Sequence, residues 1–432
     1  MSESAKGVRA KGTRPHLRVA AVALSGLVAL GASAVPAGAA PGVASVSRGS
    51  ATSAPAGPGR LLWAEHAASL SASRVRASLS ANGFDAGHTV AGVDLWRLTY
   101  ATVDPQGRSI TASGLVVVPR VSARALRTVV VEHGTLAYRG DAPSAAANPF
   151  VTGAALQAAS AGYVAVAPDY LGLGYGAGTH PYHDIPTEVS ATIDLLSATR
   201  SFLPRTGHEA THDLLVSGFS QGASAALGVA RAVQANPGGW WRVRAVSAIS
   251  GAYDATGAEI PALVSGEVPG PVAAYYVSYV LVAYNKIHHL YQRPEEVFRS
   301  PYAARVSTLF GGNVQETAIF AALPQTLNDL LTARGMALLT DHEGPLKRAL
   351  RDADRVCSWR AGVPVRLYYV PGDEQVVNAN LTSCAEKFAS VGVDATTAQL
   401  PTEPVHGSLH LGSAITGANR TFSWFLRALP PA

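Results

Sequence analysis

Residues 214–227 read LLVSGFSQGASAAL, an apolar run followed by a serine between two glycines. The pattern Gly218-Phe219-Ser220-Gln221-Gly222 fits a strand that turns sharply into a helix, with the Ser220 hydroxyl exposed on the turn. A serine hydroxyl becomes a nucleophile when an imidazole takes its proton and a carboxylate orients that imidazole. Ser220 is therefore a candidate nucleophile, and the rest of the chain should supply a histidine, an acid and amide donors.

Strand and helix patterns alternate around this motif. Two early runs, residues 94–104 and 109–119, are separated by Pro-Gln-Gly and predict a hairpin. Six further runs are mostly short and continuously apolar, as in parallel strands buried on both faces, and lie at 127–134, 162–170, 213–220, 243–251, 365–373 and, more weakly, 396–401. Helical stretches such as 188–203 and 223–234 fall between them. The sequence thus predicts an α/β fold with a mostly parallel, eight-stranded sheet and helices on both faces.

Residues 251–356 interrupt this alternation. They contain several prolines and an aromatic cluster at 274–291, but no convincing strand pattern. Since a structureless loop of this length is improbable, we expect a helical cap inserted after the sixth strand. Its tyrosines Tyr275, Tyr276 and Tyr279 would either pack the cap against the body or form an apolar wall for substrate.

The partners of Ser220 should follow it in the chain. The seventh run ends at Asp373, which places a carboxylate at the carboxyl edge of the sheet, with Glu374 as an alternative acid. Residues 401–410, PTEPVHGSLH, offer two histidines, His406 and His410.

Amide donors for an oxyanion are expected at two places. The backbone N–H of Gln221 directly follows the nucleophile. Thr135 follows His133-Gly134 after the third run, and its N–H is our choice for the second donor. His133 itself fits a structural residue of this loop better than a catalytic base.

From about residue 95 to the C-terminus the chain resembles the α/β-hydrolase superfamily, and within it the secretory-lipase-like serine esterases. The motifs that carry the resemblance are HGT at 133–135, PDYLGLG at 168–174, HPY at 180–182, GFSQGA at 218–223, GDEQVVN at 372–378, VHGSLHLG at 405–412 and WF at 424–425. Gly372 and Asp373 are adjacent here, whereas the acid turn of the family spaces them. The resemblance implies the triad Ser220, Asp373 and His406, with His410 as the alternative histidine, and a cap between the sixth and seventh strands.

This resemblance implies a carboxylic-ester hydrolase that works through an acyl-enzyme without a cofactor or metal ion. Acyl transfer or amide cleavage could use the same triad, and an inactive binding protein on this fold is a further alternative. The substrate would be a small-molecule, lipid or polymeric ester, and we expect a monomer. Tyr138 and Tyr182, together with the cap tyrosines, are candidate substrate contacts.

The N-terminus predicts export. Residues 1–39 combine a basic region, a short apolar run and a small-residue cleavage site, as in a secretory signal peptide, although a retained anchor is an alternative. Residues 40–60 read as a flexible linker before a catalytic domain at 61–432. Five of the 34 Lys and Arg residues, but only one of the 29 Asp and Glu residues, lie in 1–39. The exported chain would therefore be close to neutral, with no electrostatic basis for binding nucleic acid. We expect it to be secreted, with no membrane span after the signal peptide is removed.

The chain contains only two cysteines, Cys357 and Cys384. In an exported protein this pair predicts a disulfide, with two buried free thiols as the alternative. Neither cysteine has histidine or cysteine neighbours at the spacing of a zinc site.

Overall fold

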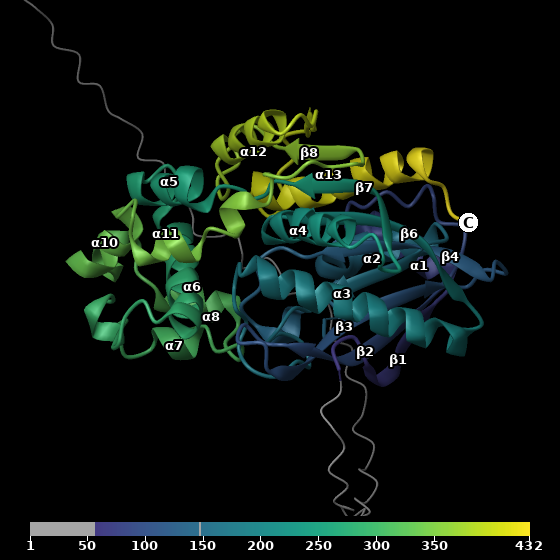
Figure 1. Cartoon of the computed structure of the whole chain (residues 1–432), viewed down its shortest axis with the longest axis horizontal. Coiled ribbons are helices and arrows are strands. Elements are labelled where there is room, and N and C mark those ends of the chain that lie inside the picture. Colours follow the sequence, from purple (N-terminus) through teal and green to yellow (C-terminus); the bar gives the residue numbers. More distant parts are fainter. Residues whose placement is uncertain (1–56, 147) are drawn as a thin grey trace, which may run out of the picture.

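The computed structural model describes residues 57–146 and 148–432. The expected signal peptide and nearly all of the expected linker lie outside these residues. The described chain is built around one sheet of nine strands in the order β1-β2-β3-β5-β4-β6-β7-β8-β9 (Figure 1). The strands are β1 (Leu61–Leu70), β2 (Val93–Val103), β3 (Ser109–Pro119), β4 (Ala125–Glu132), β5 (Val164–Pro168), β6 (Glu209–Phe219), β7 (Arg242–Ile249), β8 (Val365–Tyr369) and β9 (Thr396–Gln399).

The sheet is mostly parallel, as the sequence predicts. Strands β5, β4, β6, β7, β8 and β9 pair in parallel, while β1, β2 and β3 form an antiparallel edge that joins β5 through β3. The expected hairpin is β2–β3, with Val93 opposite Pro119 and Val103 opposite Ser109. The fold is therefore of the predicted α/β class.

The predicted number of eight strands is wrong by one. The additional strand, β1, is an edge strand in which no residue is fully buried. Because the residues of β1 are exposed or only partly buried, its sequence LLWAEHAASL lacks the long apolar run that marks the buried strands. The core of the sheet instead consists of the apolar runs of β3 to β7.

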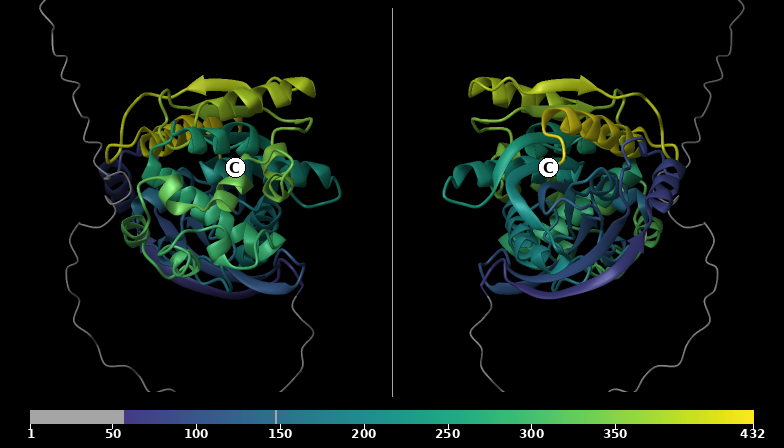
Figure 2. Two further views of the ribbon diagram at one scale, coloured as in Figure 1. Left: turned by 90° about the vertical axis from the view of Figure 1, so that its left-hand side faces the viewer. Right: turned by 90° about the vertical axis from the view of Figure 1, so that its right-hand side faces the viewer.

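Helices cover both faces of the sheet (Figure 2). One face is covered by α3 (Ile185–Phe202), α4 (Gln221–Ala235) and α12 (Ala379–Ser390). The other face carries α1 (Ala72–Ala81), α2 (Pro149–Ser160) and α13 (Leu409–Ala428). Side-chain caps fix where these helices begin: Asp184 accepts from the N–H of Thr187, and Ser408 accepts from the N–H of Leu411.

The chain between β7 and β8 folds into helices at one end of the sheet, on the left in Figure 1. Its main elements are a π-helical turn η4 (Ala255–Glu259), α5 (Ile260–Ser265), α6 (Gly270–His288), α7 (Val306–Leu309), α8 (Glu316–Ala322), α9 (Leu327–Leu330), α10 (Ala333–Thr340) and α11 (Pro345–Ala349). Short 3-10 turns complete the chain at Arg139–Asp141, Leu203–Thr206, Pro294–Glu296 and Ala353–Arg355. We refer to residues 251–356 as the cap. The cap follows β7, which is the sixth of the predicted strands, because the additional strand β1 shifts the strand numbers by one.

Cys357 and Cys384 form a disulfide that joins the end of the cap to α12. The disulfide predicted from the sequence is therefore present. It closes a chain segment that contains β8 and the turn with Asp373. Among the described helices, none combines the length and apolar character that crossing a bilayer requires.

Candidate active site

Ser220 lies at the sharp turn between β6 and α4. Its backbone has φ 55° and ψ −121°, a conformation that residues other than glycine rarely adopt. Both neighbouring glycines are required by close backbone contacts. A Cβ on Gly218 would lie 1.9 Å from the carbonyl oxygen of Gly222, and a Cβ on Gly222 would lie 2.3 Å from that of Glu132. The Gly-x-Ser-x-Gly pattern therefore has a steric cause.

The Ser220 hydroxyl is hydrogen-bonded to a histidine that is in turn held by a carboxylate. His410 Nε2 lies 2.9 Å from Ser220 Oγ, and His410 Nδ1 lies 2.9 Å from Asp373 Oδ2. The other carboxylate oxygen, Oδ1, accepts hydrogen bonds from the N–H groups of Gln375 and Val376, each at 3.0 Å. All three side chains are buried. Burial by itself lowers the pKa of His410, but the charge of Asp373 and its hydrogen bond outweigh this effect and raise that pKa above its ordinary value.

His410, and not His406, occupies this position, so the placement of His406 next to Ser220 and Asp373 is wrong. His406 is exposed in the turn before α13, whereas His410 is in the first turn of that helix and points to the sheet edge. The decisive feature is where the helix begins. Ser408 caps α13, and this cap residue was a readable signal in favour of His410.

Glu374, the alternative acid, has a different role in the structure. Its carboxylate accepts from the Ser408 hydroxyl and from the N–H groups of Leu409 and His410, at 3.1 and 3.3 Å for the two amides. Glu374 thus satisfies the free amides at the N-terminus of α13 and holds His410 in place through the backbone. It does not face the imidazole, whose Nδ1 is bound to Asp373.

Comparison with known proteins identifies the fold. No protein-family model and no curated sequence matches the chain. Among solved structures, the rice cell wall degrading esterase LipA from Xanthomonas oryzae superposes with a TM-score of 0.74 at 25% identity, over 86% of this chain and 99% of LipA. The chain has the α/β-hydrolase fold.

Two structures of lower sequence identity share that fold. A protein from Legionella pneumophila described as a hydrolase gives a TM-score of 0.76 at 22% identity, over 85% of this chain and 98% of its own. Candida antarctica lipase A gives a TM-score of 0.58 at 14% identity, over 80% of this chain and 77% of its own. The resemblance to α/β-hydrolases inferred from the sequence is confirmed.

Gln221, the first residue of α4, is fixed by its side chain. Its Nε2 amide donates to Glu188 Oε1 at 2.6 Å and lies 2.9 Å from His180 Nε2. His180 Nδ1 lies 3.0 Å from the carbonyl oxygen of Leu171, so Nδ1 carries the ring proton and Nε2 accepts from Gln221. Burial lowers the pKa of His180 to about 3, which keeps the ring neutral in this role. Glu188 is buried as well, and burial raises its pKa well above the ordinary value.

The loop after β4 holds the other expected donor, Thr135. Its hydroxyl lies 3.0 Å from the hydroxyl of Tyr182. His133 in the same loop has its ring nitrogens 2.6 and 3.3 Å from the backbone oxygens of Gly134 and Asp169, and burial lowers its pKa to about 4. His133 therefore braces the loop. The use of the Gln221 and Thr135 amides as oxyanion donors remains a prediction.

Two cavities meet at Ser220, and Thr135 and Tyr276 line both. The smaller cavity, of about 620 Å³, extends between body and cap along mostly apolar side chains, namely Ile260, Leu263, Val277, Val280, Leu339 and Leu350. The larger cavity, of about 940 Å³, is lined by His410, by aromatic residues and by the acidic residues Glu132, Asp141 and Glu316. The hydroxyl of Tyr276 donates to Gln375 Oε1 at 2.7 Å. This hydrogen bond connects Tyr276, which lines both cavities, to the turn with Asp373.

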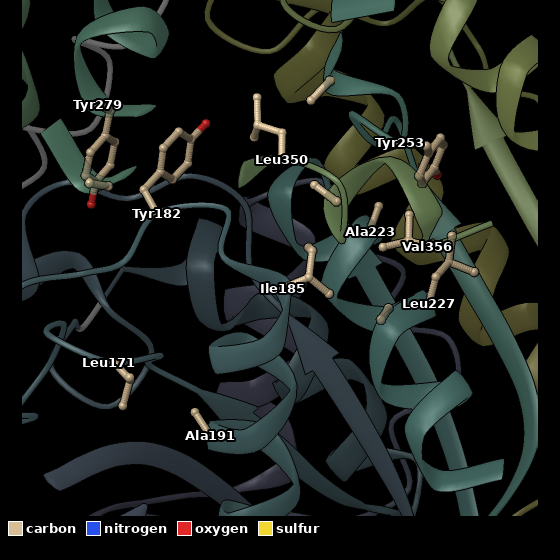
Figure 3. Packing of buried hydrophobic residues seen from close by; sticks show 14 of the residues in the cluster. Leu171, Tyr182, Ile185, Ala191, Ala223, Leu227, Tyr253, Tyr279, Leu350 and Val356 are labelled. Carbon is tan, nitrogen blue, oxygen red and sulfur yellow. The ribbon is translucent and has the colours of Figure 1, made fainter. Parts of the chain in front are cut away.

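The remaining candidate tyrosines have different positions. Tyr182 lines the smaller cavity and Tyr275 the larger one. Tyr279 lines neither: its ring stacks on Tyr182 with centroids 4.2 Å apart, as Figure 3 shows, and its hydroxyl donates to the carbonyl oxygen of Leu136. Tyr138 lines neither cavity and precedes the 3-10 turn at Arg139–Asp141. The tyrosines of α6 therefore contribute both to packing and to the cavity walls.

No cluster of three or more His, Cys, Asp and Glu side chains suited to a metal ion occurs within residues 57–146 and 148–432.

Proposed function

We propose that this protein is a serine esterase that hydrolyses carboxylic esters through Ser220, His410 and Asp373. The observation that carries the proposal is the chain of two 2.9 Å contacts from Ser220 through His410 to Asp373, placed where two cavities meet. The esterase and lipase neighbours support carboxylic-ester hydrolase activity.

The reaction would proceed in two halves. His410 Nε2 takes the proton of Ser220, whose Oγ attacks the ester carbonyl, and Asp373 stabilises the resulting imidazolium. The amides of Gln221 and Thr135 donate to the oxyanion. His410 then gives its proton to the leaving alcohol, which leaves an acyl group on Ser220. In the second half, His410 Nε2 takes a proton from a water that attacks the acyl carbonyl, and it gives this proton to Ser220 Oγ as the acid leaves. The residues need no cofactor for these steps.

We also propose that the protein works outside the cell after removal of residues 1–39. The basic and apolar pattern of this segment supports export. The disulfide between Cys357 and Cys384 is compatible with an oxidising compartment.

The test combines covalent labelling with kinetics. A fluorophosphonate should label Ser220, as peptide mass spectrometry would show, and purified protein should release acid from p-nitrophenyl butyrate. We expect Ser220→Ala and His410→Ala each to lower kcat on the order of a millionfold, because the residues of such a triad act together and losing one removes most of their joint effect. His406→Ala is the matched control, a histidine only four positions away, and should keep near wild-type rates. Loss of activity in His406→Ala but not in His410→Ala would overturn the assignment.

A further inference from the structure

The larger cavity combines acidic and aromatic side chains next to the proposed nucleophile. We propose that this cavity selects esters whose leaving alcohol carries a positive charge, such as esters of a quaternary amino alcohol, and that Glu316 recognises that charge. The proposal rests on the proposed function of Ser220, because it assigns the alcohol and the acyl group of the ester that Ser220 attacks to the two cavities.

The position of His410 decides which cavity takes the alcohol. The leaving oxygen must receive its proton from His410 Nε2, so it must lie on the side of Ser220 where His410 is accessible. His410 lines the larger cavity and does not line the smaller one. The alcohol therefore occupies the larger cavity, and the acyl chain occupies the smaller cavity, along the apolar part of a lining that also contains Glu259 and His183.

Glu316 presents a carboxyl oxygen in the wall of the larger cavity. It is the first residue of α8, in the cap, and only 7% of it is exposed. Its Oε1 accepts from the N–H of Ala137 and from the hydroxyl of Tyr275, each at 3.1 Å. Both of these bonds are to Oε1, and Oε2 has no hydrogen-bond donor among residues 57–146 and 148–432. A buried carboxyl is thus held by one oxygen while the other is available to a ligand.

The remaining wall favours a cation. Asp141 adds a second carboxyl, and no lysine or arginine is among the described residues that line the cavity. Phe84, Phe150 and Phe219 add aromatic rings, which attract cations through their faces. The N-terminus of α2 also lies at this wall, and a helix end contributes about half a positive charge. Burial raises the pKa of Glu316 to about 7 and also raises that of Asp141, and a cationic alcohol at this wall would stabilise the charged form of both carboxyls.

A matched pair of esters tests the proposal. Butyrylcholine and 3,3-dimethylbutyl butyrate share the acyl group and the shape of the alcohol and differ in one positive charge. For the wild type we expect kcat/KM to be about tenfold higher for the choline ester. Glu316→Gln keeps the shape of the side chain and should bring this ratio close to one. Glu295→Gln, which removes an exposed carboxylate of the cap, is the matched control and should leave the ratio unchanged.

Equal kcat/KM for the two esters in the wild type would overturn the proposal and leave the esterase function intact. Higher activity on glycerol monobutyrate than on butyrylcholine, lost in Glu316→Gln, would also overturn it, because Glu316 would then accept from a hydroxyl. Should Glu316→Gln fail to fold, the wild-type ratio and its decrease in Asp141→Asn decide the question.

A binding measurement separates the two proposals. Saturation-transfer NMR on Ser220→Ala protein should show tighter binding of choline than of 3,3-dimethylbutan-1-ol. If the wild type hydrolyses no ester and Ser220 is not labelled, the esterase proposal fails, while this comparison still tests the cavity. Equal binding of the two alcohols would contradict charge recognition.

Discussion

Glu132 should make the stability of the fold strongly dependent on pH. It ends β4 directly below the nucleophile turn, is 1% exposed, and accepts a hydrogen bond from Thr192 at 2.9 Å. Burial raises its pKa from 4.5 to about 8, and the hydrogen bond from Thr192 offsets only part of that effect. The folded protein therefore keeps Glu132 protonated at neutral pH.

The sign and size of the effect follow from proton linkage. Above pH 4.5 the unfolded chain loses this proton while the folded state retains it up to about pH 8. The folded state thus binds one more proton in this window, and the free energy of unfolding falls by about 1.4 kcal/mol per pH unit. Between pH 5 and pH 8 the loss from Glu132 is about 3.5 kcal/mol. Glu132→Gln keeps the shape and removes the titrating group, so this loss should disappear.

The measurement is equilibrium unfolding in urea at pH 5 and pH 8, followed by circular dichroism. We expect the free energy of unfolding of Glu132→Gln, minus that of the wild type, to rise by about 3.5 kcal/mol between the two pH values. Thr192→Val controls for the lost hydrogen bond, since it removes no ionisable group. A difference between Glu132→Gln and wild type that is the same at both pH values would refute the reasoning.

Three further predictions concern the frame of the site. Replacing both Cys357 and Cys384 by alanine should lower the free energy of unfolding by about 3.5 kcal/mol, as expected for a bridge over 27 positions; a single Cys384→Ala variant that is as stable as wild type would contradict this. Glu188→Ala removes the acceptor of the Gln221 side chain and should lower kcat by roughly 100-fold with little change in KM. Glu188→Gln should retain most activity, and equal losses in both variants would contradict a positioning role. Gly222→Ala places a Cβ 2.3 Å from a carbonyl oxygen and should abolish activity or folding, whereas Gly238→Ala, with only one atom near its Cβ at 3.9 Å, should be tolerated; an active Gly222→Ala enzyme would show that the turn can relax.

Much of the architecture could be predicted from the sequence because its signals are local. Strands buried on both faces must be continuously apolar, so the runs that became β4 to β8 are readable without a structure. The turn at Ser220 needs glycine on both sides because the backbones of β4, β6 and α4 approach closely, and this need is written as Gly-x-Ser-x-Gly. The position of Asp373 follows from the strand before it, and the pairing of Cys357 with Cys384 follows from their number.

Tertiary structure decided what depends on contacts between distant segments. Ser408 is a local signal for the start of α13. Only the structure shows that the distant Glu374 binds the first amides of this helix and that His410 faces Ser220. β1 escaped prediction because an edge strand buries too little surface to need an apolar run. The sequence also did not show which tyrosines of α6 line a cavity and which pack against other side chains. A helix stripe shows which residues are buried, but only the packed cap shows that Tyr276 borders both cavities while Tyr279 stacks on Tyr182.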